Sequence, residues 1–173
     1  MSAKPFLYVV VCAAGVASEV GVLIRAAQAG GWEVGVVATP QALGFIDAAD
    51  VESRTGYPIR SAWRAPGEPR PLPAPDAIAV APATFNTVNK WAAGISDTLA
   101  LGILCEAHGL GVPIAALPYL NAAQAAHPAY RQSLDRLRDM GVLIGTEPFR
   151  WAEALELLSP SRQGASPERG RAS

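Results

Sequence analysis

Hydroxyl, amide and amino side chains gather in one short stretch of this sequence, directly after an apolar run. The apolar run covers residues 77–81 and has the composition of a buried strand. The residues that follow it include Thr84, Asn86, Thr87 and Lys90. Such groups at the carboxyl end of a parallel strand, where a helix begins, lie where open α/β sheets bind ligands. Backbone N–H groups at that helix start favour an anion, and Lys90 is within one turn of it.

A simpler interpretation is that the threonines and asparagines of this stretch only cap the helix. A cap requires a single side-chain oxygen before the first helical turn. Pro82 is expected to end the preceding strand, because proline cannot donate a hydrogen bond to a neighbouring strand. Ligand binding and simple capping both remain open from these residues alone.

The turn after the first apolar run is a second candidate for anion binding. Gly15 lets the backbone approach an anion closely. The N–H groups of Val16 and Ala17 and the hydroxyl of Ser18 face the start of the predicted helix. This turn is therefore a candidate phosphate site.

Strand and helix patterns alternate along the chain. The predicted strands are residues 6–13, 33–38, 58–63, 78–81, 112–117 and 142–144. The predicted helices are residues 18–29, a helix opened by Thr39-Pro40 and carrying Phe45, and residues 97–109, 122–140 and 151–158. Residues 66–75 contain five prolines, which exclude a regular helix or central strand. This alternation predicts a parallel sheet with helices on both faces.

Length and composition indicate one domain. The chain has 173 residues, half of them apolar, and we expect a domain at residues 1–158 and a disordered tail at 159–173. The net charge of −1 gives no indication of a nucleic-acid surface. Cys12 and Cys105 lie in apolar runs, which favours buried thiols over a disulfide framework or a metal site. No apolar run approaches the ~20 residues that span a bilayer, so we expect a cytoplasmic protein without membrane contact.

Two blocks of the sequence resemble one known family. Residues 81–100, APATFNTVNKWAAGISDTLA, resemble the signature A-P-[ALMS]-[TS]-A-N-T-x-x-K-x-[AI]-x-G-[IL]-x-D-[NT]-L of the flavin-dependent cysteine decarboxylases. Residues 117–142 resemble that family's P-A-M-N-x-x-M-[WY]-x-H-P-A block. The N-terminal half of this chain also resembles the corresponding part of the family. The family includes phosphopantothenoylcysteine decarboxylases and enzymes that decarboxylate C-terminal peptide cysteines. The resemblance implies a Rossmann-like, three-layer flavodoxin-type fold and FMN as the cofactor.

The resemblance also assigns roles to residues at the strand ends. Asn121 matches the asparagine that holds the substrate carboxylate, and Tyr119 matches a backbone contact to the isoalloxazine. Phe45 matches an aromatic residue that lies against the flavin, although its spacing alone favours a core position. Phe85 replaces a small alanine of the family pattern. The implied FMN-binding residues are Gly15, Val16, Ala17, Ser18, Thr39, Gln41, Phe45, Thr84, Phe85, Asn86, Thr87, Lys90 and Tyr119.

The sequence departs from the family pattern where proton transfer is expected. The family's catalytic histidine falls at Gly67 by counting back from Ala81, and no histidine precedes His108. His127 matches a structural His-Pro of the family. The usual general base is therefore absent.

Two further departures affect the expected reaction. Arg64 and Arg70 lie in the altered segment and could bind a carboxylate or phosphate, but their pKa is too high for a base. No cysteine follows Cys105, whereas the coenzyme-A-type decarboxylases use a cysteine in a downstream flap. Ordinary phosphopantothenoylcysteine decarboxylation is therefore disfavoured.

Three functions remain from the sequence. The first is an FMN enzyme that oxidatively decarboxylates a C-terminal peptide cysteine or a related small-molecule thiol carboxylate, the protein supplying orientation and the flavin the redox chemistry. The second is a non-catalytic flavin-binding partner or regulatory protein. The third is a flavin prenyltransferase, which needs more basic groups than Lys90 provides. The resemblance also implies a homotrimer or a multiple of trimers, and we expect Trp91 and Phe85 to lie at a subunit interface.

Overall fold

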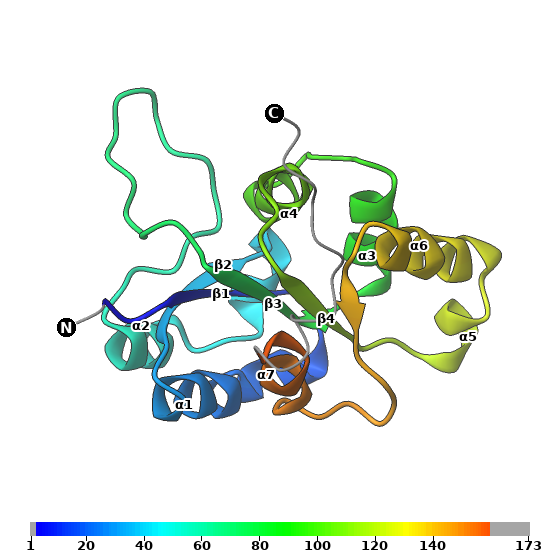
Figure 1. Cartoon of the computed structure of the whole chain (residues 1–173), viewed down its shortest axis with the longest axis horizontal. Helices are drawn as coiled ribbons and strands as arrows, with labels where there is room; N and C mark the ends of the chain where they lie inside the picture. The colour runs from blue at the N-terminus through cyan, green and yellow to red at the C-terminus, as the bar shows by residue number, and fades with distance from the viewer. Residues whose placement is uncertain (1–2, 160–173) are drawn as a thin grey trace, which may run out of the picture.

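The computed structural model of the protein describes residues 3–159 as a parallel sheet covered by helices (Figure 1). The strands are β1 (Phe6–Val11), β2 (Glu33–Ala38), β3 (Ala77–Ala83), β4 (Ile114–Pro118) and β5 (Leu143–Ile144). They pair in the order β2-β1-β3-β4-β5, and each neighbouring pair is parallel. This is the strand order of flavodoxin-like sheets, so the predicted fold class is confirmed.

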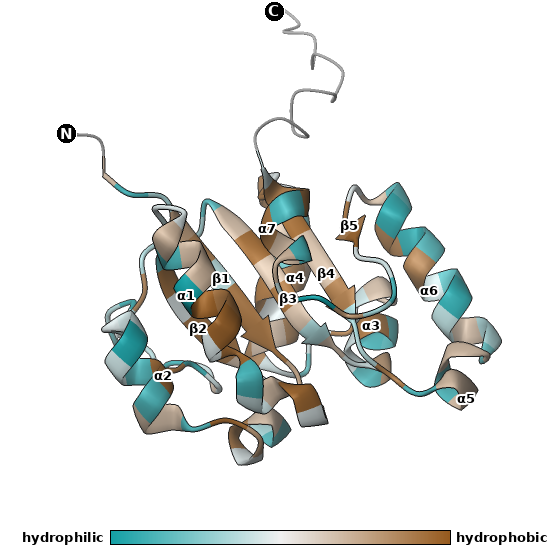
Figure 2. Cartoon of the chain, turned by 90° about the horizontal axis from the view of Figure 1, so that it is seen from below, coloured by the Kyte–Doolittle hydropathy of each residue, from teal (hydrophilic) through white to brown (hydrophobic). Residues whose placement is uncertain are grey.

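Helices cover both faces of the sheet, so successive residues of a strand are buried on opposite sides. Val9 packs with one apolar cluster and Val10 with the other, and neither side chain is exposed. Figure 2 shows the apolar strands beneath helices whose outer surfaces are polar. The first face carries α1 (Gly21–Ala29), α2 (Ala48–Thr55) and α7 (Glu153–Leu158). The second face carries α3 (Phe85–Ala92), α4 (Leu99–Leu110) and α6 (Pro128–Asp139).

The prediction that Pro82 ends its strand is wrong, because β3 continues to Ala83. The pairing of β3 with β4 shifts register between Val80 and Ala83, where the missing proline N–H falls. The carbonyl of Pro82 still accepts from the N–H of Cys12, and that of Ala83 accepts from the N–H of Tyr119. At this position β3 therefore contributes a carbonyl acceptor and no N–H donor, and proline provides that carbonyl.

The predicted helix at 122–140 is two helices, α5 (Ala122–Ala125) and α6. Pro128 is the first residue of α6, a position where its missing N–H is not needed. His127 precedes it as the cap, and its Nδ1 accepts from the N–H of Ala129 at 3.1 Å. The expected structural role of His127 agrees with this contact.

The segment after β2 also differs from its prediction. Thr39-Pro40 opens only a short 3-10 helix, η2 (Pro40–Gly44), and α2 begins after a new cap at Asp47. The predicted strand at 58–63 is reduced to a single bridge between Val37 and Arg60. A similar 3-10 helix, η1 (Gly15–Glu19), precedes α1, so the predicted helix at 18–29 begins in a different form.

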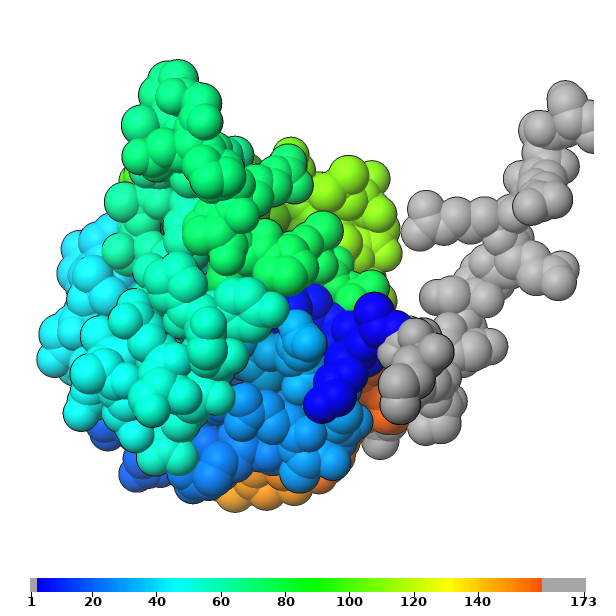
Figure 3. Space-filling view, turned by 90° about the vertical axis from the view of Figure 1, so that its left-hand side faces the viewer, coloured from blue at the N-terminus to red at the C-terminus, as the bar shows by residue number. Residues whose placement is uncertain are grey.

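The proline-rich segment 58–76 stands out from the body of the molecule (Figure 3). Its residues 66–75, as predicted, contain no regular helix or strand. It is held to the sheet by Tyr8, whose hydroxyl donates to the carbonyl of Pro73 at 2.7 Å. It also touches α4, because a Cβ atom at Gly102 would clash with the ring of Trp63.

No helix within residues 3–159 combines the length and the apolar character needed to cross a bilayer. The predicted tail lies outside the described residues, except for Ser159.

Candidate functional site

A cavity of about 750 Å³ opens at the carboxyl edge of the sheet. The segments after β1, β2, β3 and β4 all contribute to it. From β1 the chain adds β2 on one side of the sheet, and it then adds β3, β4 and β5 on the other side. Ligands of open α/β sheets bind at the point where the strand order changes direction in this way. The lining residues are Ala13, Ala14, Gly15, Thr39, Pro40, Gln41, Thr84, Phe85, Asn86, Thr87, Lys90, Asp97, Thr98, Leu101, Tyr119, Leu120, Asn121 and Gln124.

The floor of this cavity is built where β3 turns into α3. Thr84 caps α3, its hydroxyl accepting from the N–H of Thr87 at 3.5 Å and donating to the Thr87 hydroxyl at 3.3 Å. The thiol of Cys12 lies beneath and donates to the same hydroxyl of Thr87 at 3.3 Å. Burial raises the pKa of Cys12, so this group remains a thiol and supports the floor rather than acting as a nucleophile. Simple capping thus describes Thr84, whereas Asn86 is exposed and makes no side-chain hydrogen bond with the described residues.

Asn121 is positioned as the N-cap of α5. Its Oδ1 accepts from the N–H of Gln124 at 2.8 Å, which turns the oxygen toward the helix. The Nδ2 group makes no hydrogen bond with any residue in 3–159, so two N–H donors remain at the cavity wall. An amide with free donors and an occupied oxygen suits an anionic partner such as a carboxylate.

The cavity has one cation, and that cation is already paired. Nζ of Lys90 lies 2.6 Å from Oδ2 of Asp97, and both side chains are partly exposed. An ion pair of this kind contributes little to stability, but the carboxylate of Asp97 offsets positive charge that Lys90 would otherwise offer a ligand. An anion in this cavity therefore depends on backbone N–H groups and hydroxyls. The hydroxyl of Thr39 is available for this, since it has no partner within the described residues.

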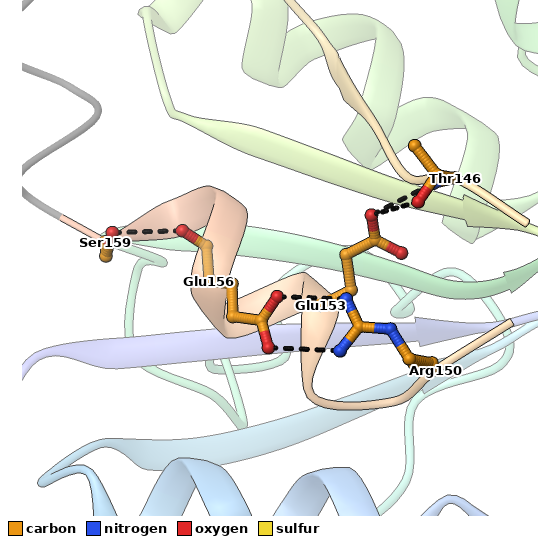
Figure 4. A network of polar contacts seen from close by, with 5 residues as sticks. All are labelled: Thr146, Arg150, Glu153, Glu156 and Ser159. Carbon is orange, nitrogen blue, oxygen red and sulfur yellow. Dashed lines mark hydrogen bonds and ion pairs between the residues drawn. The ribbon is translucent and has the colours of Figure 1, made fainter.

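The wall at Tyr119 is fixed from behind by the segment after β5. Phe149 meets the ring of Tyr119 edge-on at 5.6 Å and that of Trp151 at 4.9 Å. Figure 4 shows how this segment is fastened to α7: Oε1 of Glu153 accepts from the N–H and the hydroxyl of Thr146, at 3.0 and 2.8 Å. Glu153 is buried, so these contacts hold the segment in a defined position.

The cavity brings together most of the residues that the sequence predicted for it. They are Gly15, Thr39, Gln41, Thr84, Phe85, Asn86, Thr87, Lys90, Tyr119 and Asn121. Val16, Ala17, Ser18 and Phe45 do not line it. Ala17 is buried in the core, and the hydroxyl of Ser18 instead donates to the carbonyl of Gly15 at 3.3 Å. Phe45 follows η2 and is 44% exposed, so it lies neither in the core nor in the lining of this cavity.

The sequence also missed part of the lining. Ala13, Ala14 and Pro40 are neighbours of predicted residues, and Leu120 and Gln124 stand where the family pattern has other side chains. Asp97, Thr98 and Leu101 come from the start of α4, whose cap is the hydroxyl of Thr98. The Asp97-Thr98 pair matches the end of the family signature and could have been assigned from it.

No histidine lines this cavity. His127 caps α6 and touches the ring of Phe85 edge-on at 5.7 Å, and His108 is exposed in the last turn of α4. Gly67, the counted position of the family histidine, lines a different cavity beside the proline-rich segment. The basic, acidic and phenolic side chains of the lining are Lys90, Asp97 and Tyr119.

Comparisons with known proteins identify the family and related folds. A family model described as Flavoprotein matches residues 1–159. The crystal structure of the FMN-dependent cysteine decarboxylase TvaF, from thioviridamide biosynthesis, is 30% identical, with a TM-score of 0.74 over 88% of this chain and 96% of that one. The FMN-dependent cysteine decarboxylase SpaF is 26% identical, with a TM-score of 0.70 over 82% of this chain and 83% of that one.

Two other comparisons are more limited. The cypemycin decarboxylase CypD has a TM-score of 0.77 over 93% of this chain and 96% of that one, but at 21% identity the likeness concerns the fold. The coenzyme A biosynthesis bifunctional protein CoaBC of Thermococcus kodakarensis is 33% identical over 67 residues. That match spans 39% of this chain and 16% of the relative, so the chain accounts for only a small part of that protein.

Proposed function

This chain belongs to the Flavoprotein family, and on that basis we propose that it binds FMN and decarboxylates a thiol carboxylate, the favoured substrate being a peptide with a C-terminal cysteine. Similar folds at 26–30% identity are FMN-dependent cysteine decarboxylases, which supports this choice. The observation that carries the proposal is the convergence of four strand ends on one cavity that holds Asn121 with free amide donors.

The residues of the cavity fit FMN in size and chemistry. A volume of about 750 Å³ lies within the range of sites that enclose a cofactor-sized ligand. A Cβ atom added at Gly15 would contact nothing, so space is open beside the turn proposed for the phosphate. Hydroxyls, amides and the rings of Phe85 and Tyr119 supply partners for the ribityl chain and the ring system. FMN, when bound, supplies the redox chemistry of the reaction.

The chain's own residues orient the substrate. Asn121 would hold the carboxylate through its Nδ2 donors while its oxygen stays on the helix cap. The ion pair of Lys90 and Asp97 lies in the same cavity, and both side chains are partly exposed to solvent. No lining residue is a histidine, the side chain most often used as a general base near neutral pH.

FMN binding is the direct test of this proposal. Purified protein reconstituted with excess FMN is expected to retain one flavin per chain, visible as a yellow colour and as quenched flavin fluorescence. A protein that stays colourless after reconstitution and gel filtration would rule the proposal out.

A non-catalytic flavin-binding protein is the second candidate. It is favoured by the lack of a histidine at the cavity lining, where Lys90 and Asp97 are paired with each other. It predicts the same FMN binding without turnover. The flavin prenyltransferase alternative has no such support, since the single cation of the cavity is paired with Asp97.

Replacing Asn86 with alanine is expected to weaken FMN binding roughly ten- to a hundredfold, the cost of one good hydrogen bond to a polar group. Asn86 is exposed at the cavity and supports no other described residue through its side chain, so the fold should be unaffected. The measurement is the dissociation constant of FMN by fluorescence titration. His127→Ala is the matched control, because it removes a helix cap without removing a lining residue. Equal FMN affinities for the wild type and Asn86→Ala would exclude Asn86 from the site.

We also propose assembly into a trimer or a multiple of trimers, although one argument for it was wrong. Trp91 is 1% exposed and belongs to the core, and Phe85 is half-buried against His127 and Tyr130. The support comes instead from Phe45, which is 44% exposed beside the segment lining the cavity. Large apolar side chains that are exposed at a functional edge are typical of interfaces.

Light scattering is expected to give three times the 18.0 kDa mass of the chain, or a multiple of that value. Phe45→Asp should lower this mass, because it would place a charge in the interface. Val22→Asp, at an exposed position on α1, is the control and should leave the mass unchanged. A wild-type monomer at micromolar concentration would contradict the assembly.

A further inference from the structure

A second cavity, of about 880 Å³, lies between the proline-rich segment and α4. It shares no lining residue with the cavity at the carboxyl edge of the sheet. Its walls come from residues 60–75 on one side and from Leu99, Gly102 and Ile103 of α4 on the other. The proposed flavin function gives this cavity no role.

Three arginines line this cavity, and none of them is neutralised by a carboxylate. They are Arg60, Arg64 and Arg70. The ion pairs found within residues 3–159 involve none of them. Arg60 donates to the carbonyl of Ala62 and Arg64 to that of Glu68, which orients the side chains but leaves the charges in place. The one acidic residue of the lining is Glu106, so the lining carries an excess of positive charge.

Tyr8 lines the same cavity as these arginines. Burial raises the pKa of Tyr8, and the charges of Arg70 and Arg60 act on that pKa in the opposite direction. Both guanidinium groups therefore lie close enough to the phenol to affect it. The hydroxyl of Tyr8 is committed to the carbonyl of Pro73, so it fixes the wall of the cavity beside them.

The wall formed by α4 is apolar, and the exposed ring of Trp63, from the proline-rich segment, lies against it. Trp63 is 60% exposed, yet its ring rests on α4 at Gly102, where any larger residue would displace it. Leu99, Ile103 and Leu110 extend this surface along the helix. A flat apolar body could stack on the indole while an attached anion reaches the arginines.

We propose that this cavity binds a small amphipathic anion, in which a carboxylate or phosphate lies between Arg60 and Arg70 and an aromatic or aliphatic body packs on Trp63. Unpaired guanidinium groups at a partly enclosed surface attract oxyanions and bind them through two parallel hydrogen bonds. The prolines at 66, 69, 71, 73 and 75 restrict the segment that carries these arginines. Restricted flanks lower the entropy cost of holding the arginines around a ligand.

Calorimetry with naphthoate, naphthyl phosphate and uncharged naphthol tests this site. The three probes share one ring system and differ in charge. Titrations are made on the full chain with excess FMN present, so that the first cavity is not the measured site. We expect both anions to bind at least tenfold more tightly than naphthol, and the tighter of the two identifies the preferred head group.

Variants connect binding to the named residues. Arg60→Gln and Arg70→Gln should each weaken the anions roughly ten- to a hundredfold, and naphthol much less. The backbone of Arg60 pairs with β2, and glutamine preserves that pairing. Arg131→Gln, on the exposed surface of α6, is the matched control and should bind like the wild type.

Three outcomes would overturn the site. They are equal affinities for naphthol and the anions, wild-type affinity in Arg60→Gln and Arg70→Gln, and anion affinity that falls as FMN is added. The last result would place the probes in the first cavity. Since the second cavity needs no flavin, failure of FMN binding leaves this test in force.

Discussion

Replacing Asn121 with aspartate is expected to lower kcat/KM for a peptide ending in cysteine by about a hundredfold or more, mainly through a higher KM. The substitution keeps the cap of α5, because aspartate can accept from the N–H of Gln124 as asparagine does. It removes the Nδ2 donors and places a negative charge against the substrate carboxylate. A hydrogen bond to a charged group contributes about 1.5–3 kcal/mol, and juxtaposed like charges cost several more.

Asn121→Ser separates the two effects. Serine is also a favoured cap but brings neither amide donors nor charge. The affinity of Asn121→Ser for the peptide should therefore lie between that of the wild type and that of Asn121→Asp. Binding of an unreactive peptide that ends in serine gives a readout independent of turnover. If Asn121→Asp binds that peptide as tightly as the wild type does, Asn121 does not hold the carboxylate.

The sheet and most of the cavity lining could be predicted because they depend on local patterns. Buried parallel strands appear as apolar runs, and the polar residues that follow them must meet at one edge of the sheet. Thr84 was found in this way, since it stands directly after β3, whereas Thr39 and Asn121 were assigned from the family resemblance and follow β2 and β4. The topology then brings them together without any long-range information from the sequence.

The errors arose where neighbouring chain segments decide the conformation. Pro82 was expected to end a strand, but β3 needs only its carbonyl at that position. Helical spacing favoured a core position for Phe45, but Phe45 follows a 3-10 turn and is exposed. Trp91 was taken as a surface residue, although it faces the sheet from α3. Each of these outcomes depends on a partner that periodicity does not reveal.

Both the sequence and the structure indicate that the cavity at the carboxyl edge of the sheet has no histidine in its lining. The sequence places the family's base position at Gly67, and Gly67 lies in the lining of the other cavity. Its φ of 85° is in the left-handed region, so a histidine there would also strain the backbone. A simple exchange at this position is therefore not expected to restore a base within one chain.

FMN-loaded protein is accordingly expected to decarboxylate cysteine-terminated peptides at least about a hundredfold more slowly than TvaF measured in parallel. A positioned general base contributes about 10²–10⁴-fold to such a step, and the lining offers only Lys90, Asp97 and Tyr119 in its place. The assay follows by mass spectrometry the loss of CO₂ together with two hydrogens from the peptide. Phosphopantothenoylcysteine is tested beside it for loss of CO₂ alone, which we expect to be absent because no cysteine follows Cys105.

The possible results separate the remaining functions. Slow loss of CO₂ and two hydrogens from the peptide agrees with an FMN enzyme that relies on Asn121 and the flavin. Rapid loss would mean that another group replaces the histidine, and Asp97→Asn would then test the one carboxylate among the residues lining the cavity. No loss from either substrate, with FMN fully bound, would favour the non-catalytic flavin-binding protein. Rapid loss of CO₂ from phosphopantothenoylcysteine would contradict the inference from the missing cysteine, because re-reduction would then proceed without it.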